Sequence, residues 1–282
     1  MANYYGIDVS SYQGTIDFSK VKSAGKSFVI IRSIIKSGAV DSKAYTNIQK
    51  ATAAGLTVGI YKYVYATNTS DATKEANLIV SNFTPNNLPL GVWLDMEDST
   101  LATLGKATLT NIINTMATIL KNAGFNVGIY CNKYWYSSVL DSATLAKIYP
   151  FWIARYSSSD TGEPVSSLSP KKYACAWQYS QAGTVSGISG NVDMDLFFSD
   201  PSSFFDDDST EETTEYYDKY TGSSWRIDTV FNAIGVESKY IGGVSRRKPI
   251  ATTNGISNYN GTYTQNVALI NLAKAGKLKK AG

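Results

Sequence analysis

Two acids that lie two positions apart, Asp95 and Glu97, end the apolar run GVWLDMED at residues 91–98. Alternate side chains of a strand share one face, so these carboxylates point the same way, with Cα atoms about 6.5–7 Å apart. Crowded carboxylates raise one another's pKa, which leaves one of them protonated near neutral pH as a proton donor. The pair is therefore a candidate for acid–base chemistry.

Two further acids occupy matching positions at the two ends of the same region. Asp8 lies in the strand-like run GIDVS, and Asp193 lies near the start of the run GNVDMDLF. The first and last strands of a closed barrel are neighbours, so three strands would bring four carboxylates to one pocket. Enzymes that hydrolyse glycosidic bonds typically use a pair of carboxylates in a cleft lined by aromatic residues.

Each of these acids also has a non-catalytic interpretation. An acidic cluster can bind Mg²⁺ or Ca²⁺, and a metal-dependent hydrolase that uses these acids would lose its activity in EDTA. Asp8 can cap a turn through Ser10 and Ser11. We expect Asp98 and Asp195 to point outward or to be structural.

The absence of histidine from the chain narrows the chemistry further. It excludes Ser-His-Asp and Cys-His nucleophile systems and histidine-ligated zinc. Any acid–base catalysis near neutral pH must therefore use carboxylates, Tyr, Cys or Lys. Tyrosine-rich clefts suit sugars, although we expect most of the 20 tyrosines to be ordinary strand residues. Cys131 and Cys175 are expected to be buried free thiols, with a disulfide left open.

The first 200 residues alternate between strand-like and helix-like runs. The strand-like runs are 4–10, 27–34, 57–66, 90–97, 126–132, 150–156, 175–180 and 192–197, and the helix-like runs are 42–54, 71–82, 106–123 and 141–147. Gly55 and Gly124 follow two of the helical runs as stop signals. This alternation predicts an α/β barrel or parallel sheet, and the small number of helices predicts a barrel with helices missing.

The net charge of +3 is distributed unevenly along the chain. The segment DDDSTEETTE, residues 206–215, carries six acids and no base, which is typical of a solvated linker. We therefore predict a catalytic domain at 1–200, an acidic linker at 201–215 and a separate module at 216–282.

The last predicted module carries a net charge of +7. Its runs SWRIDTVFNAIG and TQNVALINLAKAG show helical patterns of apolar residues, the second stopping at Gly276. Turns are expected in the intervening VSRRKPIATTNGISNYNGT. We predict a small, mostly helical module.

The motifs of residues 3–200 resemble those of glycoside hydrolase family 25, the Chalaropsis-type muramidases that are common among phage endolysins. The motifs that carry the resemblance are YGIDVSSYQGTIDFSKVK, FVIIRS, AGLTVGIYKYVYA, VWLDMED, GIYCNKYW, FWIARY, WQYS and GNVDMDLF. The resemblance implies a flattened, incomplete TIM-like β/α barrel. It also implies hydrolysis of the β-1,4 bond between N-acetylmuramic acid and N-acetylglucosamine in peptidoglycan, without a cofactor or metal.

The resemblance also implies roles for the four acids. The D-x-E pair of the family falls on Asp95 and Glu97, with Glu97 as the general acid, and its other two aspartates match Asp8 and Asp193. Net retention is the implied outcome. Whether Asp95 is a nucleophile or steadies the N-acetyl group of the substrate as nucleophile stays open.

Substrate contacts are implied by the same resemblance. The residues that match the cleft of the family are Tyr61, Tyr130, Trp152 and Gln178. Tyr63 and Tyr65 share the strand face of Tyr61 and either line the cleft or fill the lumen. Arg32 has two equal interpretations, a substrate contact or a structural ion pair.

One position departs from the family pattern. Lys62 stands where many members have histidine. By alternation it points away from Tyr61, so we expect it not to affect catalysis. The loop near Asp41 is also less typical of the family.

We expect an endolysin-type muramidase whose partner is bacterial peptidoglycan, and the alternative is a catalytically inactive protein that binds wall glycan. The basic C-terminal module is expected to bind the cell wall, including an anionic wall polymer, or to form a homo-oligomer that adds avidity. Neither nucleic acid nor membrane is expected as a partner. The opening MANYYGIDVSSYQG lacks the pattern of a signal peptide, which predicts synthesis in a bacterial host cytoplasm and holin-type release to the wall.

Overall fold

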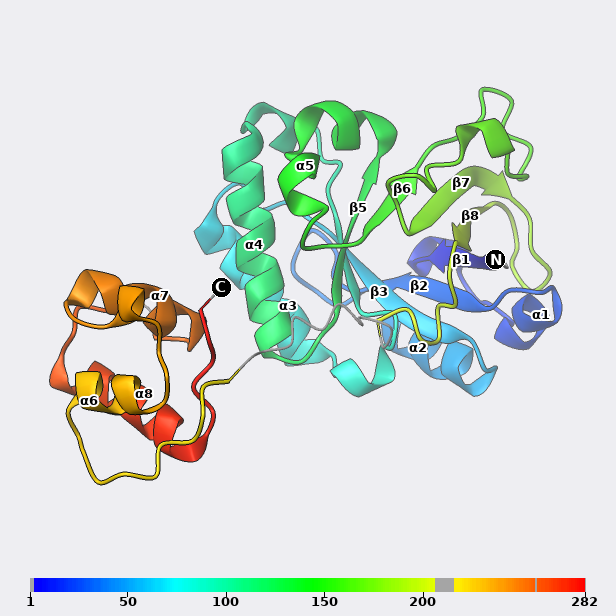
Figure 1. The fold of residues 1–282 in the computed structure, drawn as a ribbon. Coiled ribbons are helices and arrows are strands. Elements are labelled where there is room, and N and C mark those ends of the chain that lie inside the picture. Colours follow the sequence, from blue (N-terminus) through cyan, green and yellow to red (C-terminus); the bar gives the residue numbers. More distant parts are fainter. Residues whose placement is uncertain (1–2, 206–215, 257, 282) are drawn as a thin grey trace. The chain divides into compact units, whose positions relative to one another are not determined.

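The computed structural model describes residues 3–205, 216–256 and 258–281, and the chain divides into two compact units, residues 1–207 and 208–282 (Figure 1). The acidic run 206–215 lies outside the described residues. Phe204 and Phe205 pack against Trp93 with ring centroids 6.5 and 6.2 Å apart. The packed part of the first unit therefore continues past residue 200, the predicted end of the catalytic domain.

The first unit contains a closed barrel whose strands follow one another in sequence order. The strands are β1 (Tyr4–Val9), β2 (Phe28–Arg32), β3 (Thr57–Tyr63), β4 (Val92–Asp95), β5 (Val127–Asn132), β6 (Phe151–Ala154), β7 (Ala176–Gly183) and β8 (Val192–Phe197). Strands β1 to β7 run parallel, whereas β8 is antiparallel to both β7 and β1. Residues 184–191 are too short a connection for a parallel crossover, so β8 must return in the opposite direction. The predicted α/β barrel is confirmed.

The helices of this unit follow the early strands. They are α1 (Phe18–Ser23), α2 (Ala44–Ala53), α3 (Thr69–Asn82), α4 (Lys106–Asn122) and the short α5 (Ser142–Leu145). Helix α1 was not predicted from the sequence, and it starts where the Asp17 carboxylate accepts a hydrogen bond from Lys20 N at 3.2 Å. Between β6 and β7 the structure has only a 3-10 turn, Ser166–Leu168, so the ring of helices is incomplete.

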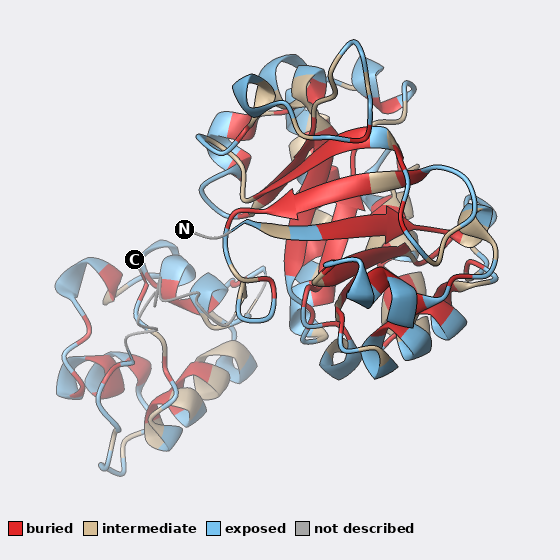
Figure 2. Cartoon of the chain, turned by 90° about the vertical axis from the view of Figure 1, so that its right-hand side faces the viewer, coloured by how far each residue is buried: buried red, intermediate tan, exposed pale blue. Residues whose placement is uncertain are grey.

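Alternation along the strands separates two hydrophobic cores, and most of the strand surface is coloured as buried in Figure 2. The outer core under the helices contains Val92, Leu94 and Met96, whereas the core inside the barrel contains Trp93. A Cβ on Gly128 would lie 2.4 Å from the Trp93 ring, so a side chain there would displace this ring. The lumen below the acids is thus filled by aromatic rings.

Both cysteines lie in the barrel as free thiols. Cys131 is buried, and the Cys175 thiol donates to Phe151 O at 3.1 Å. Among the described residues, no helix is long and apolar enough to cross a membrane.

The second unit, taken by itself, has its own hydrophobic core. Its helices are α6 (Ile227–Ala233), α7 (Val244–Thr253) and α8 (Tyr263–Ala275). Helix α8 ends at Gly276 in the left-handed conformation, at the residue predicted as its stop signal. The prediction of turns across residues 244–253 is wrong, because α7 forms there in spite of Pro249 inside it. Burial of Ile250 in the core compensates for the hydrogen bond that a proline removes from a helix.

Candidate active site

A cavity of about 990 Å³ opens where the parallel strands end. Every site residue predicted from the sequence lines it. These residues are Asp8, Arg32, Tyr61, Tyr63, Tyr65, Asp95, Glu97, Tyr130, Trp152, Gln178 and Asp193. The closed barrel brings them together from all eight strands and from the loops after β3 and β4, as expected for a site at the C-terminal face of a barrel.

The four acids come from β1, β4 and β8. Asp8 and Asp193 are directly opposite partners in the antiparallel β1/β8 pair, which places their Cβ atoms about 4.5–5.5 Å apart. Asp95 is the last residue of β4 and is buried, and Glu97 follows it at the partly exposed rim. One oxygen of the Asp95 carboxylate, Oδ1, is buried without a hydrogen-bond partner among the described residues, so it lacks the stabilisation that a buried polar atom normally has.

Burial and mutual repulsion favour protonated carboxyls in this cluster. Burial raises the pKa of Glu97, and the charge of Asp193 raises it further. Burial and the Glu97 charge raise the pKa of Asp95 well above its usual range, while Lys62 lowers it. Burial also raises the pKa of Asp8, with Asp193 and Asp195 adding to the effect. The site is therefore built to hold a proton at mildly acidic to neutral pH.

Asp193 offers a direct test of this electrostatic arrangement. Burial, followed by the charge of Asp160, raises the pKa of Asp193 to about 6. A carboxyl whose pKa is raised by folding stabilises the fold in its protonated form, and this contribution is lost as the pH rises through about 6. We expect Asp193→Asn to raise the thermal midpoint at about pH 7.5 and to have much less effect below about pH 4.

The same substitution removes a negative charge that faces Glu97. We expect the alkaline limb of the activity profile to move to lower pH, because Glu97 would then lose its proton more readily. Melting curves and kcat/KM measured across this pH range check both effects. An equal stabilisation at every pH would contradict the raised pKa of Asp193.

Gln178 is held entirely by protein groups. Its Oε1 accepts hydrogen bonds from the Tyr130 hydroxyl at 2.7 Å and from the Tyr156 hydroxyl, and its Nε2 donates to Asp8 Oδ2 at 2.5 Å. The two hydroxyl donors fix the orientation of the amide, so the NH₂ group must face Asp8. Gln178, which the sequence predicts as a substrate contact, therefore also positions Asp8.

Gln178→Glu tests this arrangement with an isosteric side chain. The carboxylate still accepts from both tyrosine hydroxyls, but it faces Asp8 without a donor. We expect a loss of stability that grows as the pH rises, because the two carboxyls can share a proton only in acid. Thermal midpoints between acid and neutral pH measure this loss.

The double variant Asp8→Asn, Gln178→Glu is the matched control. It restores one donor and one acceptor between the two positions with reversed polarity, so stability at neutral pH should recover. Activity should stay low because the carboxyl of Asp8 is gone. A Gln178→Glu variant as stable as wild type at neutral pH would refute the positioning role.

Asp195 was missed as a member of this cluster. It does not point outward: it is fully buried, and the Trp152 Nε1–H donates to its Oδ1 at 3.0 Å. It lies opposite Gly6 in the β1/β8 pair and acts on the pKa of Asp8. The period of two that joins Asp193 to Asp195 is the signal that could have identified it.

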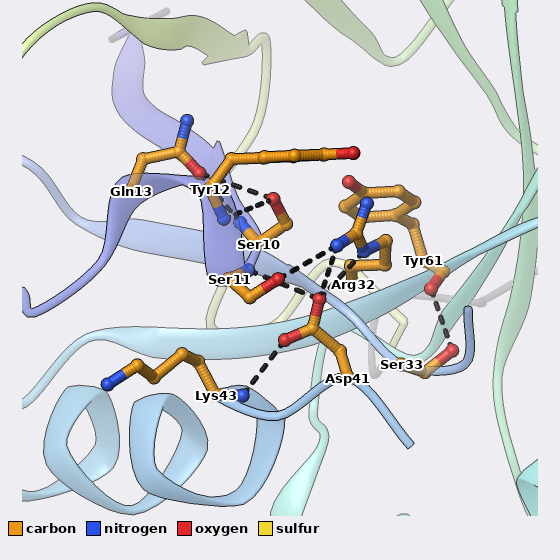
Figure 3. Close-up of polar contacts among 9 residues, drawn as sticks. All are labelled: Ser10, Ser11, Tyr12, Gln13, Arg32, Ser33, Asp41, Lys43 and Tyr61. Carbon is orange, nitrogen blue, oxygen red and sulfur yellow. Dashed lines mark hydrogen bonds and ion pairs between the residues drawn. The ribbon is translucent and has the colours of Figure 1, made fainter. Parts of the chain in front are cut away.

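Arg32 forms an ion pair with Asp41, which lies in the loop after β2 (Figure 3). The guanidinium binds Asp41 with Nε and NH2 each 2.7 Å from Oδ2, and NH2 also donates to Ser11 Oγ at 3.0 Å. These contacts support the interpretation of Arg32 as part of a structural ion pair, although Arg32 also lines the cavity. The loop near Asp41, which is less typical in sequence, supplies the partner.

Lys62 points out of the lumen and is almost completely buried. Its Nζ lies 3.0 Å from Glu75 Oε2 on α3, and it also donates to the Tyr63 carbonyl. Glu75 in turn accepts hydrogen bonds from Tyr65 N at 3.2 and 3.3 Å. The ion pair thus ties β3, and the hydrogen bonds from Tyr65 tie the chain that follows it, to α3.

Within the described part of the chain, no group of three or more Cys, Asp or Glu side chains is arranged to hold a metal ion. The acids of the cavity instead lie beside one another and beside aromatic rings. Tyr63 and Tyr65 stand with ring centroids 4.8 Å apart, and Tyr130 and Trp152 with centroids 4.4 Å apart. A row of carboxylates beside such rings can hold a sugar and transfer a proton to it.

The first unit of the chain is similar to known proteins. A profile described as "Glycosyl hydrolases family 25" matches residues 7–188. The autolytic lysozyme of Clostridium acetobutylicum is 32% identical over 194 residues, which cover 68% of this chain. The matched region spans only 55%, about half, of that lysozyme.

Solved structures match the same part of the chain. The catalytic domain of endolysin ply40, from bacteriophage P40 of Listeria monocytogenes, is 25% identical with a TM-score of 0.61, over 72% of this chain and 96% of that one. The modular autolysin LytC of Streptococcus pneumoniae, in complex with a synthetic peptidoglycan ligand, is 27% identical with a TM-score of 0.57. That match covers 70% of this chain and 47% of LytC.

Proposed function

Because the chain belongs to glycosyl hydrolase family 25, a family of lysozymes, we propose that it hydrolyses the β-1,4 bond between N-acetylmuramic acid and N-acetylglucosamine in bacterial peptidoglycan. One observation carries this proposal. Glu97, with its raised pKa, stands at the rim beside the buried Asp95, inside a cavity lined by aromatic residues. A protonated acid next to a second carboxyl is the pair that glycoside hydrolysis requires.

In the proposed reaction, Glu97 donates its proton to the glycosidic oxygen as the bond to the sugar breaks. Positive charge develops on the sugar ring, and Asp95 stabilises it from the buried end of the pair. Asp95 either attacks the sugar carbon itself or steadies the N-acetyl group of the substrate as nucleophile, and both routes retain the configuration. Glu97, now ionised, then takes a proton from the water that completes hydrolysis.

The remaining groups set the electrostatics and hold the sugar. Burial and, after it, like-charge repulsion by Asp193 raise the pKa of Glu97 and favour its protonated form. The aromatic residues of the cavity offer apolar ring faces for pyranose rings together with hydroxyl groups for hydrogen bonds. The LytC complex with a synthetic peptidoglycan ligand supports the same substrate class here.

We propose that the second unit binds the cell wall. Residues 216–282 carry a net charge of +7, which suits an anionic wall polymer. Trp225 is 53% exposed, with Lys274 Nζ 3.5 Å from the centre of its ring, and Tyr263 is 80% exposed. Oligomerisation through this unit would add avidity.

An endolysin among the relatives supports a protein made in the host cytoplasm and released to the wall by a holin.

Digestion of purified peptidoglycan, followed by mass spectrometry of the products, tests the proposed activity. Wild type should yield fragments with muramic acid at the reducing end, with and without EDTA. No glycan cleavage, with binding to the sacculi retained, would favour the alternative of an inactive glycan-binding protein. Activity that is lost in EDTA and restored by Mg²⁺ or Ca²⁺ would favour a metal-dependent hydrolase.

Binding by the second unit is tested separately on the full-length chain. Binding to sacculi that carry their anionic polymers should weaken as the salt concentration rises. Sacculi without these polymers serve as the comparison and should bind less protein. Binding should also weaken on Trp225→Ala. Unchanged binding in both cases would refute the wall-binding role.

A further inference from the structure

An exposed aromatic ring, Tyr12, lies at the rim of the candidate active site. Its side chain is 85% exposed, yet it lines the same cavity as the acids. It belongs to the 3-10 turn η1 (Ser11–Gln13), which follows the strand that carries Asp8. An aromatic ring left in water beside a cavity is a candidate contact for a ligand.

The backbone under Tyr12 is held by local hydrogen bonds. Ser10 N donates to Gln13 Oε1 at 2.9 Å, and Tyr12 N donates to Ser10 Oγ at 3.2 Å. These two contacts form a capping box around the turn. The position from which the ring projects is thus defined.

The ring itself is held by a cation (Figure 3). The Arg32 guanidinium carbon lies 4.8 Å from the centre of the Tyr12 ring, within the range of a cation–π contact. Ion pairing with Asp41 and the hydrogen bond to Ser11 keep the guanidinium in place. Arg32 therefore contacts one side of the ring, and the high exposure shows that much of the ring remains open to solvent.

Asp41 is a buried anchor for this arrangement. Its side chain is fully buried and accepts hydrogen bonds from Ser11 N at 3.1 Å and Lys43 N at 2.9 Å. Burial alone would raise the pKa of Asp41, but the backbone donors and Arg32 lower it overall. The ion pair consequently persists across the pH range in which a muramidase would work.

We propose that Tyr12 is a stacking platform for a saccharide ring at the rim of the cleft, and that Arg32 and Asp41 position it. This inference rests on the proposed function and adds a subsite for a pyranose ring of the same glycan strand, away from the bond that is cleaved. The C–H face of a sugar packs on an aromatic ring, and a ring already held in place loses less conformational entropy on binding.

The test uses soluble, uncross-linked peptidoglycan glycan strands of several defined lengths. We expect Tyr12→Ala to raise KM for long strands roughly five- to tenfold, with kcat changed less than about twofold. The shortest cleavable strands should show no effect, because they do not extend as far as Tyr12. Tyr12→Phe keeps the ring and should behave as wild type.

Arg32→Lys tests whether Arg32 positions the Tyr12 ring. Lysine can keep the ion pair with Asp41 but lacks the planar group that lies against the ring. We expect the thermal midpoint to fall, because lysine loses contacts with Asp41 and Ser11, and the KM for long strands to rise about threefold in the protein that is still folded. Tyr45→Ala is the control, because Tyr45 is also exposed on the first unit but does not line this cavity.

A second readout keeps this inference separate from the proposed activity. Calorimetric titration of the Glu97→Gln variant with the long strands measures affinity without cleavage, and adding Tyr12→Ala should weaken it by the same factor as KM. A wild type that binds but does not cleave would overturn the activity and leave the platform standing. Equal affinity with and without Tyr12→Ala, or an effect independent of strand length, would overturn the platform.

Discussion

Glu97→Gln should lower kcat on peptidoglycan glycan by roughly 10²–10⁴-fold, because general acid catalysis contributes about that much. The substitution keeps the size of the side chain and removes only the proton that the leaving oxygen needs. Glu97 lies at the cavity rim, and burial and the charge of Asp193 raise its pKa. Its protonated form is therefore favoured at the pH of the reaction. KM should change little, since the side chain contributes mainly in the transition state.

Asp98→Asn is the matched control for this prediction. Asp98 is the next acid along the chain, and its Oδ1 accepts a hydrogen bond from Thr100 N at 2.9 Å, which asparagine can also accept. It does not line the cavity, and we expect kcat within about threefold of wild type. If Glu97→Gln retained more than a tenth of the wild-type rate, another carboxyl, such as Asp193, would have to be the acid.

Much of the barrel and of its cavity follows from local sequence patterns. The period of two in VWLDME places Trp93 inside the barrel and Leu94 outside, as the structure confirms. The same period places Asp95 and Glu97 at one cavity. Strand alternation is a local property, so these positions could be predicted without knowledge of the fold.

Features that depend on contacts distant in sequence could not be predicted in this way. Arg32 and Asp41 meet only because the loop after β2 folds back, and nothing local names the partner of Arg32. Gln178 reaches Asp8 across 170 positions of sequence. Local patterns identify such residues as polar and inward-facing but leave open whether protein or substrate satisfies them.

Helix α7 and Asp195 depend on tertiary contacts that local patterns do not reveal. Helix α7 forms through Pro249 because buried side chains outweigh a weak local propensity. Of the two alternatives expected for Asp195, outward or structural, the structure supports the second: the acid is fully buried, and Trp152 donates a hydrogen bond to it. In both cases tertiary contacts override the local preference.

Lys62→Met should lower the stability of the first unit by about 3–5 kcal/mol, the usual effect of breaking a buried ion pair by removing one partner. The Lys62 and Glu75 side chains are 2% and 15% exposed, with Nζ and Oε2 3.0 Å apart. The substitution leaves the charge of Glu75 with the backbone N–H of Tyr65 as its remaining donor. Thermal and urea denaturation of the full-length chain measure the loss.

Two controls separate the buried pair from charge in general. Lys74→Met breaks the ion pair with Asp71 on the same helix, where the side chains are 72% and 42% exposed, and should have little effect on stability because solvent screens the two charges. The double variant Lys62→Met, Glu75→Gln removes both charges but keeps an acceptor for Tyr65 N, so it should recover most of the stability. No recovery in the double variant would mean that packing of the Lys62 side chain, and not its charge, stabilises the fold.

The double variant also tests the expectation that Lys62 is irrelevant to catalysis. Lys62 lowers the pKa of Asp95, against the effects of burial and Glu97 that raise it. If Asp95 must be ionised, removing the cation should move the acidic limb of the kcat/KM profile to higher pH in a protein that is still folded. An unchanged acidic limb would confine Lys62 to holding β3 against α3, and would confirm that its charge does not act on the proposed reaction.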